Sequence, residues 1–247
     1  MIDLNSIQKN IAKPARIIIY GSEGIGKTTF CTCAPSPIFV QTEGGLVNET
    51  IPAFPIAASF EDVLEALEAL GNNAHEYKTV VIESLDWLEP LIWAATCKRL
   101  VVPSIESPGY GKGYVEADTE WHRFFSYVSA VRDMGMTVIM TAHSAVVRVE
   151  DPIHPAYDTH TLKLHKRASA MAKEFSDIIG FCSLKTLLKT EDEAFGSKRN
   201  RAISTGERII HLSGSPAYSA KNRYGMPDTL PLVWNELETY LPKIKGE

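Results

Sequence analysis

One segment of the sequence has the residue types and the spacing of a phosphate-binding loop. Residues 21–28 read Gly-Ser-Glu-Gly-Ile-Gly-Lys-Thr and match the pattern G-x-x-x-x-G-K-[ST] in full. Glycines let such a loop fold around phosphate oxygens with successive backbone N–H groups pointing inward. The lysine reaches the β- and γ-phosphates, and the hydroxyl after it binds Mg²⁺. We therefore expect a Mg²⁺–nucleoside triphosphate site formed by Gly21, Ser22, Glu23, Gly24, Ile25, Gly26, Lys27, Thr28 and Thr29.

An acidic residue in the right place for the metal follows the apolar run Thr79–Ile82. Glu83 would stand at the carboxyl end of a strand, where a carboxylate beside the phosphate loop can hold Mg²⁺ through water. Aspartate is the usual residue at this position, and one extra methylene group still lets a glutamate reach the metal shell. Asp86 is the second choice, and the plain alternative is a solvated acid at a strand end.

Two further polar residues end apolar runs. Glu43 follows Phe39–Thr42 and precedes two glycines, so it could polarise a water that attacks the γ-phosphate. His143 follows Thr137–Met140 and could sense the γ-phosphate. A turn residue and a hydrogen-bonded structural histidine are the plain alternatives for these two positions.

The first part of the chain alternates short β-branched runs with helical patterns. Such alternation predicts parallel βαβ units and an α/β fold. Ser59 is expected to cap a helix whose first turn holds Glu61 and Asp62. Strands are predicted over 16–20, 38–41, 79–82 and 137–141, and helices from 27 to 33, from 59 onward, over 85–100 and over 117–134.

The later part of the chain has a different pattern. It predicts strands over 159–164 and 178–184 with a helix over 165–177 between them, and then a β-hairpin extension over 185–212 with a polar tip at 191–201. A closing helix is expected over 232–241. The chain, 1–247, is predicted to be a single domain with an N-terminal extension over 1–14.

Composition excludes several classes of protein. Hydrophobic residues make up 45% of the 247 residues and charged residues 22%, which is typical of a globular protein. The net charge of −5 argues against bulk basicity as a means of coating nucleic acid, although residues 140–225 carry 13 Lys and Arg against 9 Asp and Glu, which random scatter would also explain. No apolar run reaches membrane-spanning length, and residues 1–10 lack an export signal, so we expect a cytoplasmic protein with four buried, reduced cysteines.

Beyond the loop, the residues resemble the RecA-like recombinases. Residues 21–29 fit the loop form G-x-E-x-x-G-K-T-T of that family, including Glu23. The resemblance implies ATP as the nucleotide, Glu43 as the hydrolytic glutamate, and His143 where the family has a glutamine sensor. It also implies a RecA-like core with a mainly parallel sheet, and DNA-binding loops near 102–117 and 144–159.

Residues 221–225 read Lys-Asn-Arg-Tyr-Gly and look like the K-N-R-F-G signature of the bacterial RadA branch. In related proteins, cations at this place reach the ATP of a neighbouring subunit. The resemblance therefore implies a homo-oligomer, ring or filament, in which Lys221 and Arg223 complete the partner's site. Cations at the γ-phosphate stabilise the charge that develops in phosphoryl transfer. A basic surface turn is the alternative reading.

As a whole, the chain looks most like the compact phage ATPases of the Sak-four type, which promote single-strand annealing. Single-stranded DNA is then the expected partner, since tyrosines stack on bases and cations meet phosphates without sequence preference. A single-strand-binding protein is a further expected partner. The expected DNA-binding residues are Tyr110, Lys112, Tyr114, Arg148, Tyr157, Lys163, Lys166 and Arg167.

The resulting prediction is a Mg²⁺-dependent ATPase of a phage context, located in the bacterial host's cytoplasm, that anneals or recombines DNA strands. Two other classes stay open. One is a P-loop kinase that phosphorylates a small metabolite, which would need neither DNA loops nor a cation from a neighbour. The other is a nucleotide-switched loader that hydrolyses ATP very slowly, an option kept open by Glu83 standing where aspartate is usual.

Overall fold

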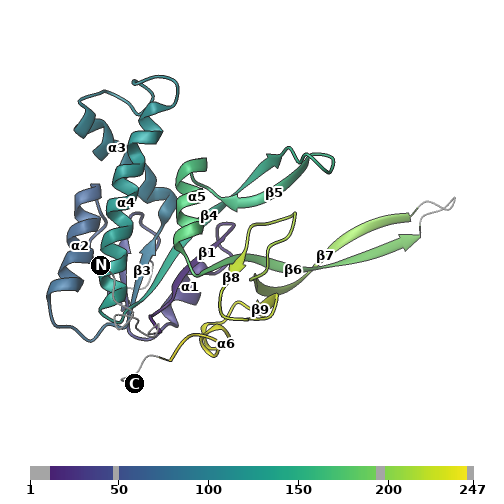
Figure 1. The fold of residues 1–247 in the computed structure, drawn as a ribbon. Helices are drawn as coiled ribbons and strands as arrows, with labels where there is room; N and C mark the ends of the chain where they lie inside the picture. Colours follow the sequence, from purple (N-terminus) through teal and green to yellow (C-terminus); the bar gives the residue numbers. More distant parts are fainter. Residues whose placement is uncertain (1–11, 47–49, 193–197, 244–247) are drawn as a thin grey trace, which may run out of the picture.

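The computed structural model describes residues 12–46, 50–192 and 198–243, and the expected N-terminal extension lies outside this part except for its last three residues. Within the described residues the strands form one mixed sheet in the order β2-β3-β4-β1-β6-β7-β9, with β5 paired to β4 and β8 paired to β6. The expected α/β class, a mainly parallel sheet flanked by helices with C-terminal antiparallel strands, is confirmed (Figure 1).

The centre of the sheet is parallel. β1 lies between β4 and β6, and β3 lies between β2 and β4, all running in the same direction. The carboxyl ends of these strands therefore meet at one edge, where ligands bind in open α/β sheets. The strands are β1 (Arg16–Gly21), β2 (Pro37–Gln41), β3 (Thr79–Glu83), β4 (Thr137–Val149) and β6 (Ile178–Asp192).

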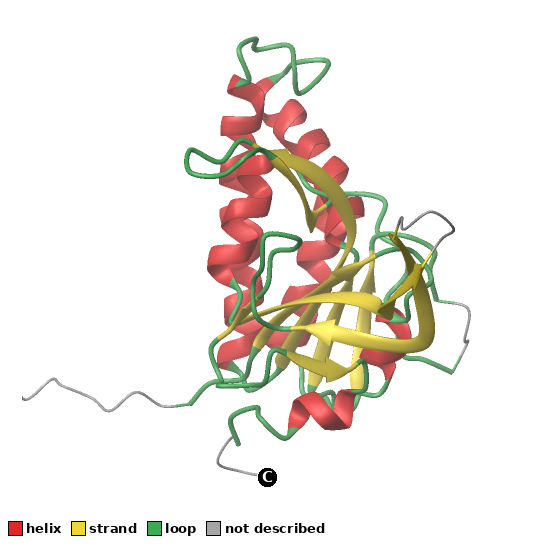
Figure 2. Ribbon diagram, turned by 90° about the vertical axis from the view of Figure 1, so that its right-hand side faces the viewer, coloured by secondary structure: helices red, strands yellow, loops and turns green. Residues whose placement is uncertain are grey.

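Alternating side chains of the parallel strands form two cores, one on each face of the sheet. Ile18 and Tyr20 pack with the long helices, whereas Ile17 and Ile19 pack with Phe30 and Trp234 on the other face. Figure 2 shows the sheet with the long helices on one side. They are α2 (Phe60–Asn72), α3 (Leu85–Leu100), α4 (Lys112–Asp133) and α5 (Lys166–Phe175), while α1 (Lys27–Thr32) and α6 (Trp234–Glu238) cover the other face.

Two β-hairpins extend from the sheet in Figure 1. β4 continues past its parallel segment and turns back as β5 (Tyr157–Leu162), so this strand is eight residues longer than the expected 137–141. β6 pairs with β7 (Lys198–His211) as the expected C-terminal hairpin. Residues 193–197 of the expected polar tip lie outside the described residues. The short strands β8 (Lys221–Asn222) and β9 (Thr229–Pro231) complete the sheet.

Local sequence signals explain most element ends. Ser59 caps α2 as expected, because its hydroxyl accepts a hydrogen bond from Asp62 N while the Asp62 carboxylate accepts one from Ser59 N. α4 begins at Lys112, five residues before the expected start. A Cβ at Gly113 would meet the Ile105 carbonyl oxygen at 1.8 Å, so this glycine permits the close approach of helix and loop rather than flexibility.

Two smaller expectations need correction. α6 spans Trp234–Glu238 and is shorter than the predicted 232–241. Cys31 and Cys182 are buried as expected, but Cys97 is half-buried and Cys33 is exposed. Across the described part of the chain, no helix has both the length and the apolar composition that crossing a membrane requires.

Candidate functional site

The phosphate loop joins β1 to α1, as the motif requires. Gly24 and Gly26 have φ values of +70° and +103°, a region that side chains other than hydrogen rarely adopt. A Cβ at Gly21 would meet the Cys182 carbonyl oxygen at 2.4 Å, so the loop passes tightly over β6. Gly26 caps α1, and the amino end of that helix therefore faces the loop.

The Lys27 side chain is buried against the backbone of the phosphate loop. Its Nζ donates hydrogen bonds to the carbonyl oxygens of Gly21, at 3.2 Å, and Ser22, at 2.9 Å. Burial lowers the pKa of this ammonium group, because its charged form loses contact with water. A phosphate bound beside it would supply negative charge that stabilises the buried ammonium.

The carboxylate of Glu83 lies against the hydroxyl of Thr28, where a loop-bound Mg²⁺ is expected. Thr28 Oγ1 donates to Glu83 Oε1 at 3.1 Å, and Glu83 Oε2 is buried with no hydrogen-bond partner in the described residues. Burial raises the pKa of Glu83. A buried oxygen without a partner, beside a hydroxyl, is a donor set that suits a hydrated Mg²⁺. Thr28 and Glu83 therefore fit this ion, which would neutralise phosphate charge there.

Glu43 is held at the same edge of the sheet by Ser84, which follows the neighbouring strand β3. Ser84 Oγ donates to Glu43 Oε1 at 2.6 Å. Ser84 is tied in turn to Thr42, whose hydroxyl donates to the Ser84 carbonyl at 2.7 Å and accepts from Ser84 N at 2.8 Å. The carboxyl ends of β2 and β3 are thus joined, and Glu43 has a fixed place beside Lys27 and Glu83.

Asp86, the second choice for the metal, has a different partner. Its Oδ2 lies 2.8 Å from His143 Nδ1, and its Oδ1 accepts from His143 N at 2.9 Å. Both carboxylate oxygens are therefore directed to His143 rather than to Thr28, which favours Glu83 as the metal-binding acid. A carboxylate on one ring nitrogen orients the imidazole and leaves Nε2 as the other polar atom of the ring.

A pocket of about 300 Å³ brings the expected groups together. It also contains Arg208 from β7, which the sequence analysis missed. No motif marks an arginine near the base of a hairpin, and only the pairing of β7 with β6, beside β1, brings it to the loop. The pocket is lined by Glu23, Gly24, Gly26, Lys27, Thr28, Thr29, Glu43, Gly45, Glu83, His143 and Arg208.

Lys221 and Arg223 lie away from the phosphate loop of their own chain. β8 pairs with β6 at Ile178 and Ile179, at the amino end of the parallel strands, whereas the loop follows the carboxyl end of β1. Lys221 Nζ donates to three carbonyl oxygens at the end of α5, those of Lys173, Glu174 and Ser176. Their expected action in a partner's site requires a second subunit and stays a prediction.

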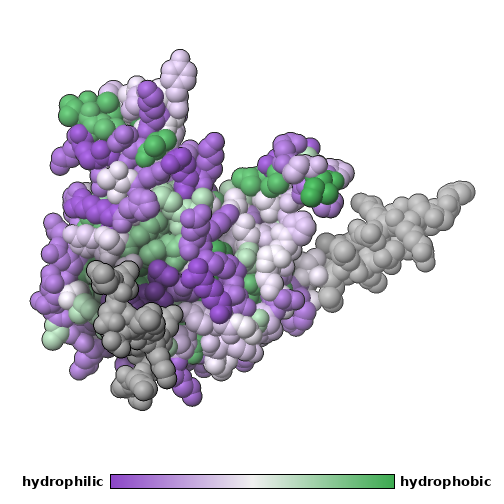
Figure 3. Space-filling view, viewed as in Figure 1, coloured by the Kyte–Doolittle hydropathy of each residue, from purple (hydrophilic) through white to green (hydrophobic). Residues whose placement is uncertain are grey.

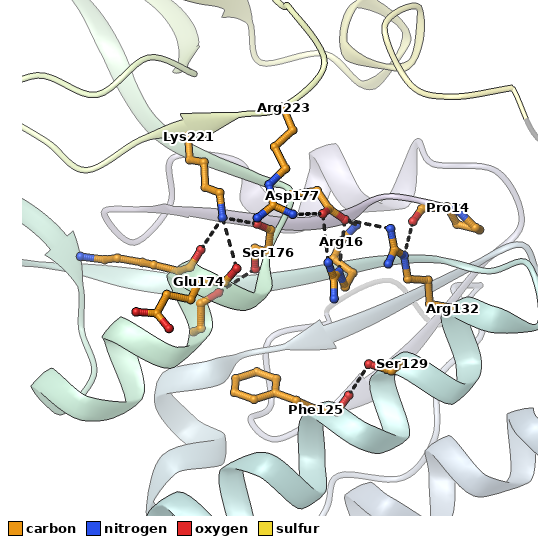
Figure 4. Close-up of polar contacts among 12 residues, drawn as sticks. Pro14, Arg16, Phe125, Ser129, Arg132, Glu174, Ser176, Asp177, Lys221 and Arg223 are labelled. Atoms are coloured by element: carbon orange, nitrogen blue, oxygen red, sulfur yellow. Dashed lines mark hydrogen bonds and ion pairs between the residues drawn. The ribbon is translucent and has the colours of Figure 1, made fainter. Parts of the chain in front are cut away.

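Arg223 belongs to a cluster around the buried carboxylate of Asp177 (Figure 4). Its Nη1 lies 3.0 Å from Asp177 Oδ1, while Arg16 and Arg132 contact the same carboxylate. Burial raises the pKa of Asp177. The hydrogen bonds from Arg16 and the positive charges of the surrounding arginines lower this pKa by a larger amount, so that the net shift is downward. The Arg223 side chain is 52% exposed despite this contact.

Some of the expected DNA-binding residues are exposed to solvent, and others have side chains that contact the rest of the protein. Tyr110 is fully exposed before α4, Lys112 and Lys166 are exposed at the starts of two helices, and Arg148 is exposed on the β4–β5 hairpin beside Glu150. Tyr157 is half-buried at the start of β5. Figure 3 shows apolar patches at the outer end of α3 and α4 and on the β4–β5 hairpin, where Val101, Val146 and Ile153 are exposed.

The other expected DNA-binding residues contact the protein itself. Tyr114 stacks on His165 with ring centroids 4.2 Å apart. Arg167 forms an ion pair with Asp118. Lys163 is exposed and lines a hollow with Ser22, Glu23, His143 and Ser144, so it lies beside the phosphate loop.

A family model described as an AAA domain matches residues 13–224. The chain belongs to this AAA-domain family. The match spans the phosphate loop, Glu43, Glu83 and the segment of Lys221 and Arg223. The protein is therefore a P-loop ATPase domain. Domains of this family typically bind Mg²⁺–ATP.

Two individual proteins are similar to this AAA domain. The SPbeta prophage-derived uncharacterized protein YorG of Bacillus subtilis (strain 168) is 27% identical over 173 residues, which cover 68% of this chain and 50% of YorG, so the chain spans about half the length of that relative. The flagellar accessory protein FlaH of Methanocaldococcus jannaschii has a distantly similar structure, with 12% identity, a TM-score of 0.39, and coverage of 85% of this chain and 88% of FlaH.

Proposed function

We propose that this AAA-domain protein is a Mg²⁺-dependent ATPase that binds single-stranded DNA and promotes strand annealing or homologous recombination in a phage context. The observation that carries the proposal is the position of Glu43, fixed by Ser84 beside Lys27 and the Thr28–Glu83 pair. The pocket thus contains an acid for water activation in addition to the groups that bind phosphate.

Each residue of the pocket has a separate part in hydrolysis. Lys27 would exchange its carbonyl partners for the phosphates, and Thr28 and Glu83 would hold the metal. Glu43 accepts a proton from the attacking water. His143, oriented by Asp86, contacts the γ-phosphate through its other nitrogen and passes the presence of that phosphate to β4, which continues into the β4–β5 hairpin. Phosphoryl transfer depends mainly on such positioning and on charge stabilisation.

The proposed DNA surface is the end of the molecule that carries the exposed aromatic and basic side chains. Tyr110 and Lys112 precede or begin α4, and Arg148 lies on the β4–β5 hairpin. Stacking contributes about 1–3 kcal/mol per base, so a few contacts per subunit add up along an oligomer. Lys221 and Arg223 are the proposed cations for the site of a neighbouring copy, and a single-strand-binding protein is a proposed further partner. The prophage origin in the name of YorG supports the phage context.

The testing experiment is steady-state ATP hydrolysis by the purified chain with Mg²⁺, with and without an unstructured single-stranded oligonucleotide at low salt. We expect hydrolysis that the oligonucleotide stimulates, because β4 connects His143 to the hairpin. A Tyr110→Ala, Arg148→Ala double variant should keep the basal rate and lose the stimulation. Hydrolysis without any response to DNA, together with no DNA binding, would refute the DNA part of the proposal. Phosphotransfer to a small metabolite would instead support a kinase.

A further inference from the structure

Arg208 reaches the phosphate loop from the opposite side to Glu43 and Glu83. It lies in β7 opposite Leu184 of β6, and β6 pairs with β1, which leads into the loop. Its Nη1 would be 2.9 Å from a Cβ placed on Gly26, so the guanidinium lies directly over the glycine that caps α1. Backbone N–H groups at such a helix end are the place where a phosphate binds.

The local backbone directs Arg208 toward this position. The pairing of β6 with β7 changes register between Leu184 and Thr186, and Gly206 has a φ of +80°. An irregularity of this kind bends a strand and re-aims the side chains beside it. Lys185, at the same irregularity, forms an ion pair with Glu207 at 2.7 Å and is not part of the pocket.

The Arg208 side chain makes no hydrogen bond or ion pair with the residues that the structure describes, although Glu23, Glu43 and Glu83 line the same pocket. Lys27 is the other cation of that pocket. A nucleoside di- or triphosphate would bring several negative charges into a space that already holds three carboxylates. A second cation over the loop is therefore what the charge of the ligand requires, and an arginine fork matches the geometry of phosphate oxygens.

We propose that Arg208 binds the nucleotide of its own chain, through the phosphate that sits over Gly26 at the start of α1. This inference rests on the proposed nucleotide site and adds to it a cation supplied in cis by the C-terminal hairpin. The base of the β6–β7 hairpin and the phosphate loop then share one ligand. Arg208 and Arg223 have separate tasks, since Arg223 lies with Asp177 near the amino ends of the parallel strands, at the opposite end of the sheet from the phosphate loop.

The test is ADP binding by titration calorimetry with the full chain, comparing the unchanged protein with Arg208→Ala and Lys185→Ala. ADP is chosen because it retains the phosphate over Gly26 and lacks the γ-phosphate that Glu43 and His143 address. We expect Arg208→Ala to weaken ADP binding about tenfold, as for the loss of one charge-assisted hydrogen bond pair. Lys185→Ala, which removes a cation from the same hairpin base, should bind ADP as the unchanged protein does.

Arg208→Gln removes the charge but keeps a polar, unbranched stem, and it replaces Arg208→Ala if that variant does not fold; Arg208→Lys should recover part of the affinity. ADP binding by Arg208→Ala or Arg208→Gln within threefold of the unchanged protein would overturn the inference. An equal loss in Lys185→Ala would overturn it too, because it would assign the effect to the hairpin as a whole. Failure of the unchanged protein to bind ADP would instead refute the nucleotide site itself.

Discussion

The hydroxyl of Ser84 donates a 2.6 Å hydrogen bond to Oε1 of Glu43 and joins the ends of two neighbouring strands. Thr42 binds the Ser84 backbone through its own hydroxyl, so the contact is part of a small network rather than a chance approach of two side chains. Among the residues that the structure describes, Glu43 Oε2 has no hydrogen-bond partner, and Glu43 lines the pocket from which a water would attack. Groups that act on a reacting water need such fixed orientation.

Glu43→Gln should lower the rate of ATP hydrolysis by about 100-fold or more while ADP still binds, because the amide keeps the shape but cannot take a proton. Ser84→Ala should lower kcat by about tenfold with little change in KM, since it frees the carboxylate without removing it. Single-turnover hydrolysis and ADP titration measure the two effects. Ser126→Ala, at an exposed serine of α4, is the matched control. Equal loss of ADP binding in Glu43→Gln would contradict a role in the water-activation step.

Lys27→Ala should abolish measurable ATP hydrolysis and weaken ATP binding. The ammonium is already buried with only carbonyl partners, so its replacement removes the positive charge that the phosphates require. The fold should survive, because the two hydrogen bonds to Gly21 and Ser22 lie within the loop. Steady-state hydrolysis and a thermal melt check both points. Full activity in a folded Lys27→Ala protein would refute the assignment of the loop.

Much of the fold could be predicted from local sequence. The β-branched runs of β1 and β3 and the cap at Ser59 mark their elements directly. The length of β4 could not be predicted, because residues 144–149 are held in a strand by pairing with β5 and not by burial. The start of α4 could not be predicted either. Gly113 stands in its first turn because the Ile105 carbonyl oxygen comes too close for a Cβ, and this contact is not visible in the sequence.

The site divides in the same way. The loop and Glu43 follow strand ends, Glu83 ends β3, and His143 ends the part of β4 that pairs with β1, so parallel pairing is enough to bring them together. The pairing of Asp86 with His143 could not be foreseen, because it depends on how α3 leaves β3. Arg208 reaches the pocket from an antiparallel strand, next to a shift in register. Neither the pairing nor the shift can be recognised in the sequence.

Asp86→Asn should impair hydrolysis more than nucleotide binding. The asparagine keeps the hydrogen bond that it accepts from His143 N but has only one oxygen, so the imidazole loses its fixed orientation. We expect about a tenfold lower kcat and a smaller stimulation by DNA, with ADP affinity unchanged. His143→Ala should give the same result, and the double variant should be no worse than either single variant. Additive losses would show that the two residues act separately.

Glu89→Gln should make the protein less sensitive to alkaline pH. Glu89 is buried under His165 N, and burial raises its pKa from 4.5 to about 7. A carboxyl with a raised pKa stabilises the fold most below pH 4.5, and this stability is lost as the pH rises through 7. The difference corresponds to about 3 kcal/mol of unfolding free energy as an upper figure.

Thermal melts at pH 5 and pH 8 test this expectation for Glu89. The unchanged protein should lose more stability between these two pH values than Glu89→Gln does. Glu65→Gln, at an exposed position of α2, serves as the control and should follow the unchanged protein. A melting temperature of Glu89→Gln that falls just as steeply would contradict a buried acid at this position.

Arg223→Ala should remove hydrolysis but keep nucleotide binding if Arg223 completes a partner's site. The fold should tolerate the change, because Asp177 keeps its contacts with Arg16 and Arg132. Lys221 is a poorer choice, since its loss would leave three carbonyl oxygens at the end of α5 without their cation. A cation of this kind contributes about 10³- to 10⁵-fold to the rate in related phosphoryl-transfer enzymes.

Mixing Arg223→Ala with Glu43→Ala separates action in trans from a role within one chain. In a mixed oligomer, an intact Glu43 of one subunit meets an intact Arg223 of its neighbour at about a quarter of the interfaces of an equal mixture. Each variant alone should be inactive, and the mixture should regain up to that share of the activity. Arg123→Ala, whose arginine pairs with Glu61 away from the site, should stay active and controls for the loss of a surface arginine. No recovery in the mixture, with subunit exchange demonstrated, would assign Arg223 to the Asp177 cluster alone.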